Sequence, residues 1–179
     1  MVQNSKNVSP MSNEGRNAYV IEHINQALFK LLEEKTINAI SISEICDIAG
    51  VGRMSFYRNY ESKEDVLRKQ LLKLIQEWGK DFEEKGEPSY FSESLLRHYY
   101  KYREFYLLLY RQGLSNMIYE TIRAAVKLDE AANNMERYIK SMVAGTIWGW
   151  VDEWMRQGMP ETPEEIILLS SQLKNEQQI

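Results

Sequence analysis

The stretch of sequence that most constrains this chain runs from Ser41 to Lys63 and reads SISEICDIAGVGRMSFYRNYESK. Ser41 and Glu44, three residues apart, form a capping box, so a helix is predicted to begin directly after Ser41. Gly50 ends that helix, because a C-terminal cap commonly needs a positive φ angle. A second helix is predicted over residues 53–59. The stretch therefore predicts two short helices joined by a tight turn and followed by a longer helix.

The second short helix carries polar side chains along most of its length. Arginine, serine, tyrosine and asparagine dominate it, and Phe56 is its apolar anchor. Such groups are suited to hydrogen bonds with the phosphates and base edges of DNA. The composition of this helix therefore favours a role in reading DNA.

The order and spacing of these residues resemble the helix-turn-helix of the tetracycline-repressor (TetR) family of bacterial regulators, over roughly residues 17–72. Three positions depart from the family pattern. Gly52 replaces the usual serine cap, Asn59 stands where histidine is common, and Tyr60 stands where phenylalanine is common. The change of cap should cost only a few tenths of a kcal/mol. The matching positions are Ile45, Ala49, Gly50, Val51, Arg53, Ser55, Phe56, Tyr57, Tyr60, Ser62, Lys63, Glu64, Val66 and Leu67.

The resemblance implies a DNA-binding transcription regulator, most often a repressor, that works as a homodimer and responds to a small-molecule effector. It implies that Arg53, Ser55 and their neighbours enter the major groove, and that Tyr57 and Lys63 hold phosphates. In a dimer the two recognition helices are expected roughly 34–36 Å apart, so the operator on double-stranded DNA should be a near-palindrome. The predicted DNA-binding residues are Ser41, Gly52, Arg53, Met54, Ser55, Tyr57, Arg58, Asn59 and Lys63.

The charge of the chain restricts how it can bind DNA. The net charge is −4, and residues 1–70 hold nine basic and nine acidic residues. The net charge of −4 argues against a protein that coats nucleic acid nonspecifically, and the N-terminal part is neutral overall. A DNA-binding surface must therefore come from the arrangement of Arg53, Arg58 and Lys63 on one side.

Cysteine usage and hydropathy indicate the compartment. The single cysteine, Cys46, excludes an intrachain disulfide, which fits a reducing cytoplasm. The N-terminus lacks the apolar segment of a signal peptide, and no apolar run approaches the roughly 18 residues of a membrane helix. We expect a cytoplasmic protein with no membrane partner.

Helical periodicity along the chain predicts an all-α fold. Together with the resemblance, this implies a flexible tail over residues 1–16, a three-helix DNA-binding head over residues 17–72, and a helical ligand-binding and dimerisation bundle over residues 73–179. Ser89 is expected to cap the helix that follows the Gly-Glu-Pro break at residues 86–88. The expected helices outside the motif cover about residues 17–34, 63–84, 114–127 and 130–157, with another from residue 163, and residues 89–110 also read as helical.

The C-terminal half is unusually aromatic. Tyrosine hydroxyls inside a helical bundle need hydrogen-bond partners, and a partly polar pocket for a small ligand would satisfy that need. Packing of the same rings in the core is the alternative interpretation. The predicted pocket residues are Tyr99, Tyr102, Tyr106, Tyr110, Met117 and Trp148.

Gly145 and Gly149 lie four residues apart in the predicted penultimate helix, where each costs about 1 kcal/mol and needs a packing reason. The last helix is strongly apolar for a terminal helix. The layout is similar to the C-terminal region of one branch of TetR-like regulators, which implies a four-helix dimer interface. Close packing within one chain is the alternative. The predicted interface residues are Met142, Gly145, Thr146, Gly149, Trp150, Ile166, Leu169 and Leu173.

Other classes of function remain open on the sequence. One alternative is a helical interaction protein whose motif no longer reads DNA, or an activator or coregulator that responds to a partner protein. Another is an enzyme, but His23 and His98 lie on separate helical stretches, and no Ser/His/Asp, Cys/His or metal-ligand spacing recurs. We therefore expect no catalytic residue, no metal and no cofactor.

Overall fold

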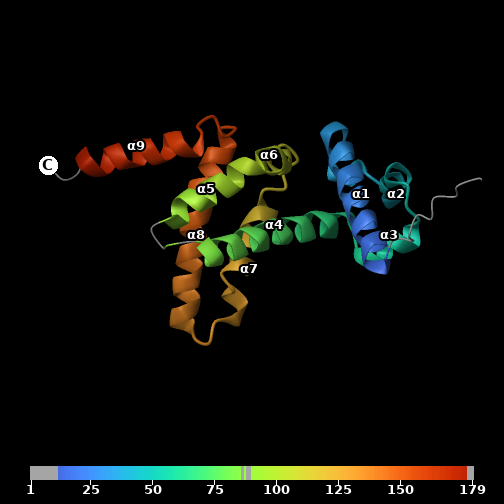
Figure 1. The fold of residues 1–179 in the computed structure, drawn as a ribbon, viewed down its shortest axis with the longest axis horizontal. Helices are drawn as coiled ribbons and strands as arrows, with labels where there is room; N and C mark the ends of the chain where they lie inside the picture. Colours follow the sequence, from blue (N-terminus) through green and yellow to red (C-terminus); the bar gives the residue numbers. More distant parts are fainter. Residues whose placement is uncertain (1–11, 86, 88–89, 177–179) are drawn as a thin grey trace, which may run out of the picture. The chain divides into compact units, whose positions relative to one another are not determined.

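The computed structural model describes residues 12–85, 87 and 90–176 (Figure 1). The structure is 82% helical and has no strand among these residues, which confirms the all-α class. The chain divides into two compact units, Met1–Val66 and Leu67–Ile179. The division falls inside helix α4 (Lys63–Lys85), whereas the sequence placed the boundary near residue 72.

The first unit holds α1 (Asn13–Glu34), α2 (Ile42–Ala49) and α3 (Arg53–Asn59), together with the start of α4. A short 3-10 turn, η1 (Ile37–Ala39), joins α1 to α2. The bounds of α2 and α3 are those that the capping signals predict.

Helix α1 begins at Asn13, four residues before the expected start. The cause is local, because the Ser12 hydroxyl accepts a hydrogen bond from the Gly15 N–H at 3.0 Å and caps the helix. Residues 13–16 of the expected tail are therefore helical. Residues 1–11 of that tail lie outside the described residues.

Apolar side chains of α1 pack against α2 and α3 and form the core of the first unit. Ile24, Leu28 and Leu32 of α1 are fully buried, as are Ile45 of α2 and Phe56 of α3. Full burial of one such side chain stabilises a fold by about 1.5–3 kcal/mol. This shared core fixes α3 against its neighbours and leaves its other side in solvent.

The second unit contains most of α4 and the helices that follow it. Helices α7 and α8 run side by side, while α5 contacts both α6 and α9 (Figure 1). The elements after α4 are α5 (Phe91–Lys101), α6 (Arg103–Arg111), α7 (Asn116–Ala125), the 3-10 turn η3 (Leu128–Glu130), α8 (Asn134–Arg156) and α9 (Pro163–Glu176).

Two breaks in the second unit differ from the sequence prediction. The aromatic stretch over residues 89–110 is interrupted at Tyr102, which leaves the helical region with φ −108° and ψ 24°. Helix α8 begins at Asn134 and not near residue 130, because the Asn133 side chain accepts a hydrogen bond from the Glu136 N–H at 2.9 Å. Before it, Lys127 adopts a left-handed conformation with φ 53° and opens η3.

The start of α9 follows its sequence signal. The Thr162 hydroxyl accepts a hydrogen bond from the Glu165 N–H at 3.3 Å, and the Glu165 carboxylate accepts one from the Thr162 N–H at 2.8 Å. This reciprocal pair is a capping box, and it starts α9 at residue 163, where the sequence places that helix. The expected cap at Ser89 lies outside the described residues.

Candidate nucleic-acid interface

Helix α2 is fixed at its first turn by a network of three side chains. The Ser41 hydroxyl accepts a hydrogen bond from the Glu44 N–H at 3.2 Å, and the Glu44 carboxylate accepts one from the Ser41 N–H at 2.9 Å. Lys35 adds an ion pair to Glu44 at 2.6 Å. The hydrogen bond from Lys35, with those from Ser41, lowers the pKa of Glu44 to about 2. The capping box therefore remains charged over the physiological range of pH.

The turn between α2 and α3 depends on Gly50. Its φ angle is +64°, in the left-handed region that glycine adopts without strain. The Val51 N–H then donates to the Cys46 carbonyl at 3.0 Å and closes the end of α2. Gly52 occupies the N-cap of α3 with no side-chain hydrogen bond, as its missing hydroxyl requires.

Helix α3 presents a continuous polar and aromatic surface to solvent. Met54 is 79% exposed and Tyr57 is 55% exposed, and Arg53 and Arg58 are exposed beside them. Phe56, on the opposite side, is fully buried and packs edge-on against Tyr57 at 5.6 Å between ring centroids. Four of the six side chains that the sequence assigns to DNA binding on this helix are thus held outward by one buried anchor, namely Arg53, Met54, Tyr57 and Arg58.

Two of the predicted DNA-binding cations are hydrogen bonded within the first unit. The Arg53 guanidinium donates to the Ser43 hydroxyl of α2, and the Lys63 ammonium donates to the Ile40 carbonyl at 2.6 Å. An arginine has five donors and a lysine three, so each group keeps others for a phosphate or a base. Neither Ser43 nor Ile40 could be predicted as a partner from the sequence, because both contacts join residues ten or more positions apart.

Ser55 and Asn59 lie on the side of α3 that faces α1. The Asn59 side chain donates to the Ser55 carbonyl at 2.9 Å. Together with Arg58 they border a cavity of about 320 Å³ whose other wall is the beginning of α1. The residues that line it are Asn13, Arg16, Asn17, Val20, Ser55, Arg58 and Asn59.

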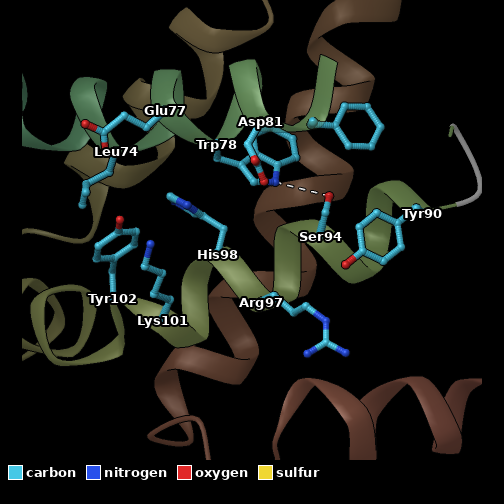
Figure 2. A pocket seen from close by; sticks show the side chains of 11 residues that line it. Leu74, Glu77, Trp78, Asp81, Tyr90, Ser94, Arg97, His98, Lys101 and Tyr102 are labelled. Atoms are coloured by element: carbon cyan, nitrogen blue, oxygen red, sulfur yellow. Dashed lines mark hydrogen bonds between the residues drawn. The ribbon is translucent and has the colours of Figure 1, made fainter. Parts of the chain in front are cut away.

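A second, larger cavity of about 560 Å³ lies in the second unit between α4 and α5 (Figure 2). Its walls combine aromatic rings, such as Trp78 and Tyr102, with charged groups, such as Glu77 and Lys101. The Trp78 indole N–H donates to the Ser94 hydroxyl at 3.3 Å, which joins the two helices across one side of the cavity (Figure 2).

His98 lines the same cavity and is almost fully buried. Its Nε2 atom lies 2.9 Å from the Tyr106 hydroxyl, and its ring lies 6.2 Å from that of Trp78. Burial, helped by the charge of Lys101, lowers the pKa of His98 to about 4. The imidazole is therefore neutral at physiological pH and links the cavity to the core through Tyr106.

The predicted pocket residues are distributed over several environments. Tyr102 lines the cavity of Figure 2, and Tyr99 lines a smaller apolar cavity of about 190 Å³. Tyr106 is buried against His98, and the Tyr110 hydroxyl donates to Asp152. The chain itself therefore supplies partners for two of the tyrosine hydroxyls. Met117 is half-buried, and Trp148 is half-buried between Tyr110 and Tyr119.

Most of the residues that line the cavity of Figure 2 were not predicted as site residues from the sequence. No site role was predicted for Trp78, and His98 entered only as one of two histidines on separate helical stretches. Lys101 and Glu77 carried no signal of their own. The i, i+4 spacing of Glu77 and Asp81 on α4, like that of Arg97 and Lys101 on α5, would have been the available sign.

The predicted interface residues on α8 lie on its solvent-exposed face. Met142 is 66% exposed and Trp150 is 41% exposed, with Gly145, Thr146 and Gly149 exposed between them. A Cβ atom added to either glycine would meet nothing within 4 Å. On α9, Leu169 is 52% exposed and Ile166 is half-buried, while the side chain of Leu173 lies outside the described residues.

Two kinds of site are not found among the described residues. They contain no cluster of three or more histidine, cysteine, aspartate or glutamate residues that could hold a metal ion. Within the same ranges, no helix has the length and apolar character needed to span a membrane.

Comparisons with known proteins place the chain in a family. A family profile described as "Bacterial regulatory proteins, tetR family" matches residues 24–69, and one described as "Transcriptional regulator C-terminal region" matches residues 86–176. The crystal structure of Lin0861 from Listeria innocua has a similar fold, with a TM-score of 0.73 at 18% identity, over 93% of this chain and 94% of that one. Curated proteins gave no significant match. Because one profile covers about half of the chain and the other covers the helix-turn-helix, the chain belongs to the tetR family of bacterial regulators and is a DNA-binding transcriptional regulator.

Proposed function

We propose that the protein is a homodimeric repressor that binds a near-palindromic operator and releases it when a small effector binds. The observation that carries this proposal is the outward surface of α3, where Arg53, Met54, Tyr57 and Arg58 are exposed around a single buried anchor. A short helix with such a surface fits the major groove.

The roles within this surface follow from the chemistry of each group. The Arg53 guanidinium opens α3, and its fork suits the O6 and N7 acceptors of guanine. Tyr57 and Lys63 are assigned to phosphates, because a phenol and an ammonium at the edge of the motif recognise charge and not sequence. Ser41, Gly52, Met54, Ser55, Arg58 and Asn59 complete the proposed DNA surface.

Dimerisation is supported by the exposed apolar face of α8 and α9. A single helix-turn-helix buries too little surface for tight, specific binding, and a two-fold axis supplies a second one. The exposed glycines of α8 leave room for close approach of another helix. We assign this face, from Met142 to Trp150 on α8 with Ile166, Leu169 and Leu173 on α9, to the partner subunit.

The effector is assigned to the cavity between α4 and α5. Its volume of about 560 Å³ lies in the range of small-molecule sites, and its lining mixes aromatic rings with a few polar groups. Tyr102 contacts this space directly. Tyr106 reaches it through its contact with His98, and Tyr99 shares a smaller apolar cavity with Trp78. We assign Tyr99, Tyr106, Tyr110, Met117 and Trp148 to the packing that responds to the ligand.

Binding-site selection from random DNA tests this function. The parent protein should enrich a near-palindrome, and Arg53→Ala should weaken binding to it by about 1–3 kcal/mol and relax the preference at one position of each half-site. Lys63→Ala should weaken operator and random DNA by similar factors and reduce the salt dependence by about one unit. The same enriched sequence for Arg53→Ala and the parent would contradict the proposed reading.

A reporter gene placed behind the enriched sequence distinguishes repression from activation. Expression of the protein should lower transcription of the reporter. Higher transcription would support an activator that responds to a partner protein. Failure of the parent protein to enrich any sequence would favour a helical interaction protein that no longer reads DNA.

A further inference from the structure

We infer that the cavity between α1 and α3 is a binding site for a backbone phosphate of DNA, held by Arg16 and Arg58. The inference rests on the DNA-binding role proposed above and extends the contact surface from the helix-turn-helix to the first turns of α1. Arg16 becomes a positioning contact that fixes where α3 enters the groove.

The cavity is formed by two helices of the first unit that pack on each other. Asn13, Arg16 and Asn17 approach it from α1, and Ser55, Arg58 and Asn59 approach it from α3. It has a volume of about 320 Å³, and Val20 supplies the apolar part of its lining. Amide, hydroxyl and guanidinium groups are the side chains that most often contact phosphate oxygens.

The charge of the cavity is entirely positive. Two arginines line it and no carboxylate does, although the chain as a whole carries a net charge of −4. Neither Arg16 nor Arg58 forms an ion pair within the part of the chain that the structure describes. Two guanidinium groups without a counter-charge repel each other, and an anion between them removes that repulsion.

Arg16 is held in position before any ligand arrives. Its Nη2 atom donates to the Asn13 side chain at 3.0 Å, which places the guanidinium along the first turn of α1. A positive side chain near a helix N-terminus is unfavourable for the helix dipole, whereas a phosphate there is favourable. The small penalty at Arg16 is thus offset when the cavity holds an anion.

The cavity is continuous with the surface of α3 that is assigned to the major groove. Arg58 belongs to both, because it is exposed beside Met54 and also lines the cavity. A backbone phosphate in the cavity would therefore lie directly beside the bases that α3 reads. Free phosphate has the same chemistry, and the experiment separates the two sources.

Binding of a labelled random-sequence duplex, measured by fluorescence anisotropy over a range of salt concentrations, tests the inference. Arg16→Ala should weaken binding about tenfold at low salt and reduce the magnitude of the salt slope by about one. Arg16→Lys keeps the charge and should keep the slope. Arg111→Ala, an exposed arginine of the second unit, is the matched control and should change neither quantity.

A double-mutant cycle tests whether the two arginines bind the same phosphate. The loss of affinity in Arg16→Ala with Arg58→Ala should be smaller than the product of the two single losses, because both groups share one partner. Inorganic phosphate at millimolar concentration should compete with the duplex only weakly. Binding of inorganic phosphate that Arg16→Ala abolishes, together with an affinity for the duplex that Arg16→Ala leaves unchanged, would instead identify a site for the free anion and overturn the assignment to DNA.

The outcome also separates this inference from the proposed function. Unchanged affinity and slope in Arg16→Ala, together with weaker binding in Lys63→Ala, would overturn the phosphate site and leave the helix-turn-helix in its role. If the parent protein binds no duplex, both the proposed function and this site are wrong. Circular dichroism of each variant confirms that α1 remains folded.

Discussion

At the scale of single residues, the groups assigned to ligands are held by neighbours before a ligand binds. Arg53 is tied to Ser43, and Lys63 is tied to Ile40. His98 is buried at the cavity between α4 and α5 with its Nε2 atom on Tyr106. Ordering a long side chain in advance reduces the entropy lost on binding. The fold of each unit therefore holds these side chains in place before a ligand binds.

The buried imidazole of His98 makes the stability of the second unit depend on pH. Burial lowers the pKa of His98 from 6.5 to about 4. Between these values the unfolded chain binds more protons than the folded chain, so stability that is complete above about pH 6.5 is lost as the pH falls toward 4. The loss should reach about 3 kcal/mol at most. Urea unfolding at about pH 7.5 and about pH 5 measures it.

His98→Gln is the matched variant for this measurement. Glutamine keeps a polar group near Tyr106 but does not titrate, so the difference in stability between the two pH values should become smaller. Lys101 faces the same cavity and keeps its charge throughout, and ordinary carboxyl groups titrate at lower pH. An equal dependence on pH in the parent and the variant would show that His98 is not the group responsible.

At the scale of the elements, a helix end was predicted correctly where neighbouring residues mark it, and was missed where no such local signal was recognised. The two ends of α2 and the starts of α3 and α9 are predicted correctly, because a capping box or a glycine marks each of them locally. The break at Tyr102 has neither glycine nor proline to mark it. Helix α1 starts early because Ser12 caps it, a signal that the sequence analysis did not use.

The residues of the candidate sites also differ in whether the sequence could predict them. The exposed surface of α3 follows from its spacing around Phe56, so its residues could be named from the sequence. The cavity that joins Arg16 to Arg58, and the one that joins Trp78 to His98, depend on which helices pack together. Such contacts join distant parts of the chain, and helical periodicity carries no information about them.

Gly50, at the C-cap of α2, and Gly79, inside α4, give predictions of opposite sign. Gly50 has φ +64° and no atom within 4 Å of an added Cβ, so Gly50→Ala should cost about 1–2 kcal/mol through backbone strain alone. Gly79, inside α4, is equally open but has no positive φ. Gly79→Ala should therefore stabilise the protein by about 0.5–1 kcal/mol. Urea unfolding of both variants checks the two signs, and a neutral Gly50→Ala would contradict the role of the turn.

At the scale of the whole molecule, the second unit exposes apolar side chains that a second copy of the chain would remove from water. Met135, Tyr138, Ile139 and Met142 continue along α8 toward the glycines, and Leu168 and Leu169 of α9 are each more than half exposed. Large contiguous apolar patches are uncommon on monomeric proteins. A second copy of the chain would cover this face, and the same two-fold axis would give the operator its symmetry.

Gly149→Leu tests the dimer, because the structure separates its effect on the interface from its effect on the fold. Among the residues that the structure describes, a Cβ added at Gly149 meets no atom within 4 Å apart from its chain neighbours and the backbone of its own helix, so a leucine there should leave the single chain folded. Between two subunits it should push the paired helices apart and abolish operator binding. Gly79→Leu, at an equally open helical position, is the control and should leave both association and operator binding unchanged. Sedimentation equilibrium at micromolar concentration should give twice the 21.1 kDa chain mass for the parent and the control, and the chain mass for Gly149→Leu. A parent protein that sediments at 21.1 kDa would end the dimer proposal, and the symmetric operator with it.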